Sequence, residues 1–206
     1  MKRHFLVALL LGAFLAPAAA QVNTVPQVGT ISAVQKQYSY SATAVGLVPA
    51  ASATDIFCIS AGTSRNISIK QIKIAGTAGI AITTPFLIYR RSALGTLGTP
   101  ATGTALPVAA PLYPNDPASS ATLVSYTANP TVASSPILMD AALVDLPVTT
   151  AAGGSVTERL SYGESLSWFN HNLVIPKGTT QQICVNLNGV SVSSGVLNIS
   201  MFWTEQ

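Results

Sequence analysis

Apolar and polar residues alternate with a period of two along much of the chain after residue 52. The clearest case is residues 196–203, whose alternate apolar positions are Leu197, Ile199, Met201 and Trp203. Such alternation indicates β-strands with one buried face. Similar runs bounded by turn residues cover residues 53–60, 66–75, 80–91, 121–126, 141–148, 165–175 and 181–187. With no amphipathic helical pattern after residue 20, the sequence predicts an all-β chain forming a single β-sandwich or jelly-roll-like domain.

One predicted strand breaks its alternation in the middle. Ile67 and Ile69 occupy one face, whereas strict alternation places Ile72 and Ile74 on the other. An extra residue at positions 70–71 would account for this change of phase. We therefore expect a β-bulge there.

Two prolines help to place other segments. Pro85 lies inside the predicted strand 80–91 and has no N–H to give to a sheet, which favours an edge strand or a kink. Residues 21–50 are expected to form an N-terminal arm that ends near Pro49. Within that arm, residues 38–41 alternate and could form one edge strand.

The first twenty residues have the layout of a secretory signal peptide. Lys2 and Arg3 precede an apolar run, and three alanines end at Ala20. The run is shorter than the roughly twenty apolar residues that a spanning helix needs. We expect cleavage after Ala20, an exported protein starting at Gln21 and no membrane span in the mature chain. The expected domains are thus a signal peptide at 1–20, an arm at 21–50 and a sandwich at 51–206.

Charge is sparse and does not point to nucleic acid. The full chain has 10 basic and 7 acidic residues, a formal net charge of +3. Losing Lys2 and Arg3 leaves eight basic residues against seven acidic ones, a net charge of about +1. Only 8% of the residues are charged, against about a quarter in typical domains. No basic patch is visible, so we expect no nucleic-acid partner.

The chain has two cysteines, Cys58 and Cys184, each within a strand-like run. Export makes a disulfide between an early and a late strand chemically possible, and we expect this bond. The alternative is a pair of buried free thiols that never meet.

No catalytic, cofactor-binding or metal-binding set is recognisable. His171 is the one histidine after residue 20, and no metal-ligand partners lie near it at a suitable spacing, so we expect a structural role. Ser165 follows a glycine and a glutamate, but the second glycine of a nucleophile elbow is missing. The carboxylates are scattered along the chain. They are Asp55, Asp116, Asp140, Asp145, Glu158, Glu164 and Glu205.

Residues 92–120 are rich in Gly, Thr, Ala and Pro, and a loop of that length is usually functional or mobile. Tyr113, Asn115 and Asp116 would give it an aromatic surface and polar groups, which makes it a possible binding loop. Asp116 between Asn115 and Pro117 is also typical of a turn, and its oxygen could take part in calcium binding, although a full ligand set is not apparent. The alternative is a spacer, or a segment that covers a sheet edge.

Residues 50–206 resemble a family of small β-rich proteins from tailed bacteriophages and bacteria, described as virion-associated or hypothetical. The most distinctive block is YTANPT at 126–131. Other matching blocks lie at 53–57, 67–76, 90–92, 115–116, 185–189, 199–200 and 203–205. The resemblance implies a β-sandwich with a structural or attachment role on a particle surface, and it carries over no catalytic residue. The signal peptide departs from this pattern, because a virion protein assembled in the cytoplasm should not have one.

These observations predict a non-enzymatic structural or surface-attachment protein, exported and plausibly a subunit of an oligomeric particle or extracellular assembly. Its expected partners are further copies of itself or other subunits. A secreted carbohydrate-binding or adhesin domain with a glycan ligand is one alternative, and an unrecognised hydrolase is another. Exposed aromatic rings beside Asp or Asn would favour the glycan binder. Two carboxylates converging in a cleft would favour the hydrolase.

Overall fold

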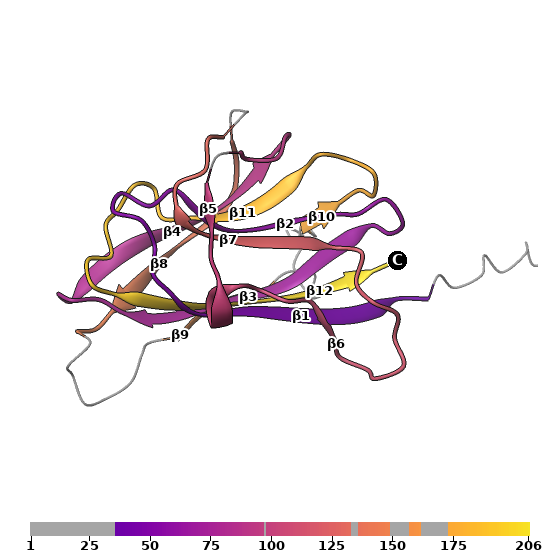
Figure 1. Cartoon of the computed structure of the whole chain (residues 1–206), viewed down its shortest axis with the longest axis horizontal. Helices are drawn as coiled ribbons and strands as arrows, with labels where there is room; N and C mark the ends of the chain where they lie inside the picture. The colour runs from indigo at the N-terminus through magenta and orange to yellow at the C-terminus, as the bar shows by residue number, and fades with distance from the viewer. Residues whose placement is uncertain (1–35, 97, 133–135, 149–156, 162–172) are drawn as a thin grey trace, which may run out of the picture. The chain divides into compact units, whose positions relative to one another are not determined.

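The computed structural model describes residues 36–96, 98–132, 136–148, 157–161 and 173–206. Its strands form two six-stranded antiparallel sheets that lie as two layers (Figure 1). The first sheet contains, in spatial order, β10 (Leu173–Ile175), β3 (Ile67–Thr77), β12 (Val196–Glu205), β1 (Tyr38–Leu47) and β6 (Ala110–Pro111), and β9 (Thr157–Ser161) also pairs with β3. The second contains, in order, β5 (Thr99–Pro100), β7 (Thr122–Ala128), β2 (Asp55–Ser60), β11 (Gln182–Asn186), β4 (Ile82–Arg91) and β8 (Ile137–Leu146).

The strand pairing is that of a jelly roll. Early strands pair with late ones in reverse order: β1 with β12, β2 with β11, β3 with β9 and β10, and β4 with β8. Successive members of this set alternate between the two sheets, so the chain folds like a long hairpin whose arms are wound together. The stretch that holds β5, the 3-10 helix η1 (Gly103–Ala105), β6 and β7 is inserted between β4 and β8. The predicted all-β sandwich is therefore confirmed.

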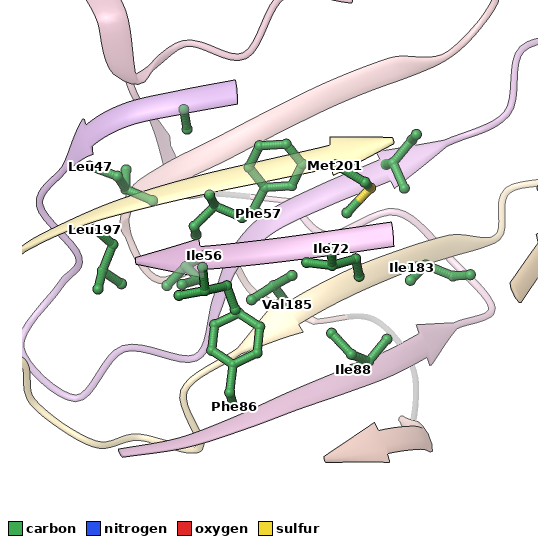
Figure 2. Close-up of a cluster of buried hydrophobic side chains, with 14 of the residues drawn as sticks. Leu47, Ile56, Phe57, Ile72, Phe86, Ile88, Ile183, Val185, Leu197 and Met201 are labelled. Atoms are coloured by element: carbon green, nitrogen blue, oxygen red, sulfur yellow. The ribbon is translucent and has the colours of Figure 1, made fainter. Parts of the chain in front are cut away.

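The core lies between the two sheets and is built from their inward-facing side chains. Phe57, Val185 and Ile88 come from the second sheet, whereas Ile72 and Met201 come from the first, and all five are buried (Figure 2). Burying one such side chain contributes about 1.5–3 kcal/mol. No helix in the described part of the chain is long and apolar enough to span a membrane.

The β-bulge in β3 is present and changes which face two isoleucines occupy. Phe202 of β12 pairs with Gln71, but the next residue of β12 pairs with Ile69, so Lys70 is the extra residue. The inserted residue returns Ile72 and Ile74 to the core face, where both are buried. Strict alternation had placed them on the opposite face, and that assignment is wrong because a bulge resets the pleat.

The strand that contains Pro85 is not an edge strand, which corrects the prediction from its proline. β4 lies between β11 and β8. However, β11 pairs with β4 only from Leu87 to Arg91, so Pro85 has a sheet neighbour only in β8, where it faces Leu143. A proline is tolerated here because the strand has an open side at that residue.

Other predicted segments differ in their limits. The alternating residues 38–41 begin a longer strand, β1, which belongs to the first sheet although it falls in the segment expected as an arm. The predicted strand 141–148 begins earlier, at Ile137. The expected signal peptide, residues 21–35 of the arm and residues 165–172 lie outside the described residues.

Candidate functional site

The disulfide predicted from the sequence is present. Cys58 and Cys184 are direct partners across β2 and β11, their Cα atoms are 4.1 Å apart, and both side chains are buried. The bond joins positions 126 residues apart in sequence. It therefore fastens the two central strands of the second sheet to each other.

A buried ion pair lies beside the disulfide. The Nε and Nη2 atoms of Arg91 donate to the two carboxylate oxygens of Asp55 at 2.8 and 2.7 Å, and Asn186 donates to the same carboxylate at 2.6 Å. The ligand-type atoms of Asp55, Cys58 and Cys184 lie within 4.8 Å of one another. The two sulfur atoms are bonded to each other, and the carboxylate accepts three hydrogen bonds from Arg91 and Asn186. We therefore assign this cluster to holding β2, β4 and β11 together.

A second buried carboxylate, Glu205 at the end of β12, anchors the inserted segment. It accepts hydrogen bonds from the side chains of Ser119, Ser120 and Trp203 and from the backbone N–H groups of Ser120 and Ala121. Burial by itself raises the pKa of Glu205, but the hydrogen bonds from Ser119, Ser120 and Trp203 outweigh it and hold the pKa below its usual value. The last strand thus fixes the chain just before β7.

Tyr40 and Arg65 extend this anchor. The Tyr40 hydroxyl donates to the carbonyl of Pro117 at 2.9 Å and accepts from Arg65 at 3.1 Å. Arg65 also lies 3.3 Å from Glu205, and the Tyr40 ring stacks on Trp203. Burial, with a further contribution from Glu205, raises the pKa of Tyr40. The base of the loop is therefore tied to β1 and β12 by aromatic, ionic and hydrogen-bonding contacts.

The three residues singled out in the long loop lie in one turn. The N–H of Asp116 donates to the carbonyl of Tyr113 at 3.0 Å, as expected for a turn at this position. Tyr113 is 65% exposed, Asn115 is exposed and Asp116 is half-buried. The turn presents one aromatic ring and one amide to solvent.

The rest of the long loop covers sheet edges, which is one of the roles considered for it. β5 pairs with β7 and extends the second sheet, whereas β6 pairs with β1 and extends the first. Thr104 of η1 donates to the carbonyl of Val45, so η1 lies beside β1 as well. The segment from η1 to β6 thus runs along β1 and leaves that edge only partly open.

Apolar side chains are exposed along this edge, a feature that alternation alone did not reveal. We call the set the loop-edge surface; its members are Val45, Leu106, Val108, Leu112 and Tyr113. Contacts with β1 hold the segment in place: Thr104 bonds to Val45, Ala110 pairs with Ser41, and Leu112 donates to Ser39. Val108 is the most open member, at 70% exposure. Exposed apolar side chains that follow one edge of a sandwich make that edge a candidate interaction site.

A second apolar surface lies on the edge strand β8. We call it the β8-edge surface; its members are Ile137, Leu138 and Leu143, exposed by 61%, 54% and 68%, and the neighbours Ile137 and Leu138 project from opposite faces of the strand. β8 is ten residues long and contains neither proline nor lysine. The other outer strands that the structure describes are shorter. β5 and β6 have two residues each, one of which is a proline, β10 has three residues and β9 has five. Short edges and prolines limit pairing with other chains, and β8 has neither protection.

These two surfaces lie at opposite edges of the sandwich. β1 packs beside β7 at one edge, whereas β8 packs beside β3 and β9 at the other. Four strands of the second sheet separate β8 from β5 at the other edge. A partner on one surface therefore leaves the other open.

The described part of the chain also contains a hollow beside β4 and β8. This hollow of about 280 Å³ is lined by Ala81, Ile82, Thr83, Asp145, Leu146 and Pro147, and Asp145 is the one carboxylate among these described residues. That carboxylate accepts a hydrogen bond from Thr83. His171, Glu164 and Ser165 lie outside the described residues. The side chain of Glu158 is likewise not described.

No known protein family, curated protein or solved structure matches this chain. The fold and the two apolar surfaces are therefore the basis for a functional assignment.

Proposed function

We propose that this protein is a non-enzymatic structural or surface-attachment subunit, exported and assembled with further copies of itself. The observation that carries the proposal is the pair of apolar surfaces at opposite edges of a rigid sandwich. Burying exposed apolar groups against a partner is favourable, so these surfaces favour association. A fold alone does not define a function, so the proposal rests on these surfaces.

The chemistry of the described residues supports a structural role. Asp55 and Glu205 are buried; Asp55 accepts hydrogen bonds from Arg91 of β4 and Asn186 of β11, and Glu205 accepts them from Trp203 of β12 and from the segment just before β7. Residues used in this way stabilise the fold and are not free to bind or activate a substrate. Export is supported by the Cys58–Cys184 bond, because disulfides persist mainly in oxidising compartments.

Light scattering coupled to size-exclusion chromatography tests the proposal. The full gene is expressed, and the protein is purified from the periplasm or the medium. We expect a mass of several chains at micromolar concentration. A single-chain mass at every concentration, up to the limit of solubility, would refute self-assembly. N-terminal sequencing of the same sample should give Gln21, and an intact Met1 would contradict the proposed export.

The turn at Tyr113 favours a second candidate, a carbohydrate-binding or adhesin domain. Tyr113 and Asn115 are both exposed in one turn, and an aromatic ring beside an amide is a common way to stack and hydrogen-bond a sugar. Trp203 and Tyr40 are buried and cannot extend that face. A glycan array probed with the wild type and with Tyr113→Ala tests this candidate. Binding that the substitution removes would support it, and no binding by the wild type would dismiss it.

A further inference from the structure

We propose that copies of this chain associate head to tail, with the loop-edge surface of one copy contacting the β8-edge surface of the next. This inference rests on the proposed function and names the partner, a second copy of the same chain. A single type of contact between copies would then cover both apolar surfaces.

The backbone of β8 is suited to contact along its open side. The N–H of Ala141 donates to the side chain of Asp140 at 2.8 Å. In an antiparallel ladder, alternate residues direct their backbone groups to the same side. Among the described strands, only β4 pairs with β8, so alternate residues of β8 direct their backbone groups to the side away from β4. Main-chain groups point outward in the plane of the sheet at this edge, and the exposed Leu143 side chain projects from the sheet beside them.

Charge argues against β8 pairing with itself. β8 carries Asp140 and Asp145 and no basic residue. A symmetric contact would bring the exposed Asp145 side chains of two copies into one interface, and like charges facing each other across strands are destabilising. The other edge is different, since Lys36 is exposed there, 4.9 Å above the Tyr38 ring, while Asp116 is half-buried. The acidic β8-edge surface therefore meets less repulsion at the loop-edge surface than at a second β8.

The position of the two surfaces decides the kind of assembly. Because they lie at opposite edges, a contact between unlike surfaces leaves one surface open at each end of a pair. Such a heterologous contact builds a ring if the rotation closes and a filament if it does not. The chain has little net charge to oppose this, with 10 basic and 7 acidic residues in total.

Two complementary variants test the inference. Val108→Lys blocks the loop-edge surface, and Leu143→Lys blocks the β8-edge surface. Both sites are about 70% exposed, so folding should survive, and circular dichroism checks this. Ile80→Lys is a matched control, because Ile80 is 78% exposed in the turn between β3 and β4 and belongs to neither surface. Val108→Ser and Leu143→Ser replace the lysine variants if either of those fails to fold.

We expect each blocked variant alone to run as a monomer and the Ile80→Lys control to assemble like the wild type. An equimolar mixture of the two blocked variants should form a pair with twice the monomer mass, because each variant keeps one intact surface. Self-association of Val108→Lys alone, or no pair in the mixture, would overturn the head-to-tail arrangement. If the wild type itself is monomeric, the proposed function fails. If the wild type assembles and both blocked variants still do, only this inference fails.

Discussion

The anchor at Glu205 gives the sharpest prediction about how the inserted segment is held. We consider Glu205→Gln, which keeps the shape of the side chain but removes its charge and one acceptor oxygen. Six donor groups converge on the carboxylate: the side chains of Ser119, Ser120, Trp203 and Arg65 and the backbone N–H groups of Ser120 and Ala121. The new NH2 group can only donate, and it takes the place of one acceptor oxygen, so it must face some of these donors.

About half of the donors contact each carboxylate oxygen, so roughly three lose their acceptor. A buried donor left unsatisfied costs about 1–3 kcal/mol, and the serine hydroxyls can rotate to limit that cost. Breaking a buried pair by removing one partner costs about 3–5 kcal/mol. We therefore expect Glu205→Gln to lower the free energy of unfolding by about 3–5 kcal/mol at pH 7.

Urea unfolding followed by circular dichroism measures this change. With a slope of about 2 kcal/mol per molar urea, the midpoint should fall by about 1.5–2.5 M. Asp145→Asn is the control, because Asp145 is exposed and a change there should alter the stability by less than about 1 kcal/mol. A loss below about 1 kcal/mol for Glu205→Gln would refute the reasoning, since the carboxylate would then not hold the loop.

The difference in stability between the wild type and Glu205→Gln should also depend on pH. The pKa of Glu205 is lower in the folded protein than its ordinary value, so its stabilising effect is fully present above that ordinary value. The effect is lost as the pH falls through the lower, folded pKa. The stability difference between the wild type and Glu205→Gln should therefore shrink on acidification and be constant around neutral pH. A difference that grows at low pH would contradict the assigned direction.

Two further changes probe the second sheet. Replacing Cys58 and Cys184 together with alanine should lower the free energy of unfolding by about 5 kcal/mol, because the bond closes a loop of 126 residues in the unfolded chain. A loss below about 1 kcal/mol in urea unfolding would contradict this estimate. Arg91→Met should lower the free energy of unfolding by about 3–5 kcal/mol, since it leaves the buried Asp55 carboxylate without its cation. The double variant with Asp55→Leu should recover part of that loss, and a double variant less stable than Arg91→Met would show that the charge is not the cause.

The sequence by itself determined the strands and several local features. Alternation placed β12 and most of the other strands, because a period of two follows from the pleat of any strand with one buried face. The phase change near Lys70 revealed the bulge, and the short polar run before Pro117 predicted the turn at Asp116. The two cysteines predicted their bond, because no other pairing exists within the chain. Each of these features depends on neighbouring residues or on composition.

Only the tertiary structure decided which strands are neighbours. Pro85 suggested an edge strand, but β8 pairs outside β4, and that pairing connects residues far apart in sequence. Likewise, no local pattern indicates that Glu205 accepts hydrogen bonds from the segment before β7, or that Val108 and Leu143 lie at opposite edges. These features depend on the long-range pairing of early with late strands, which sets burial and edge position by contacts that a short stretch of sequence does not contain.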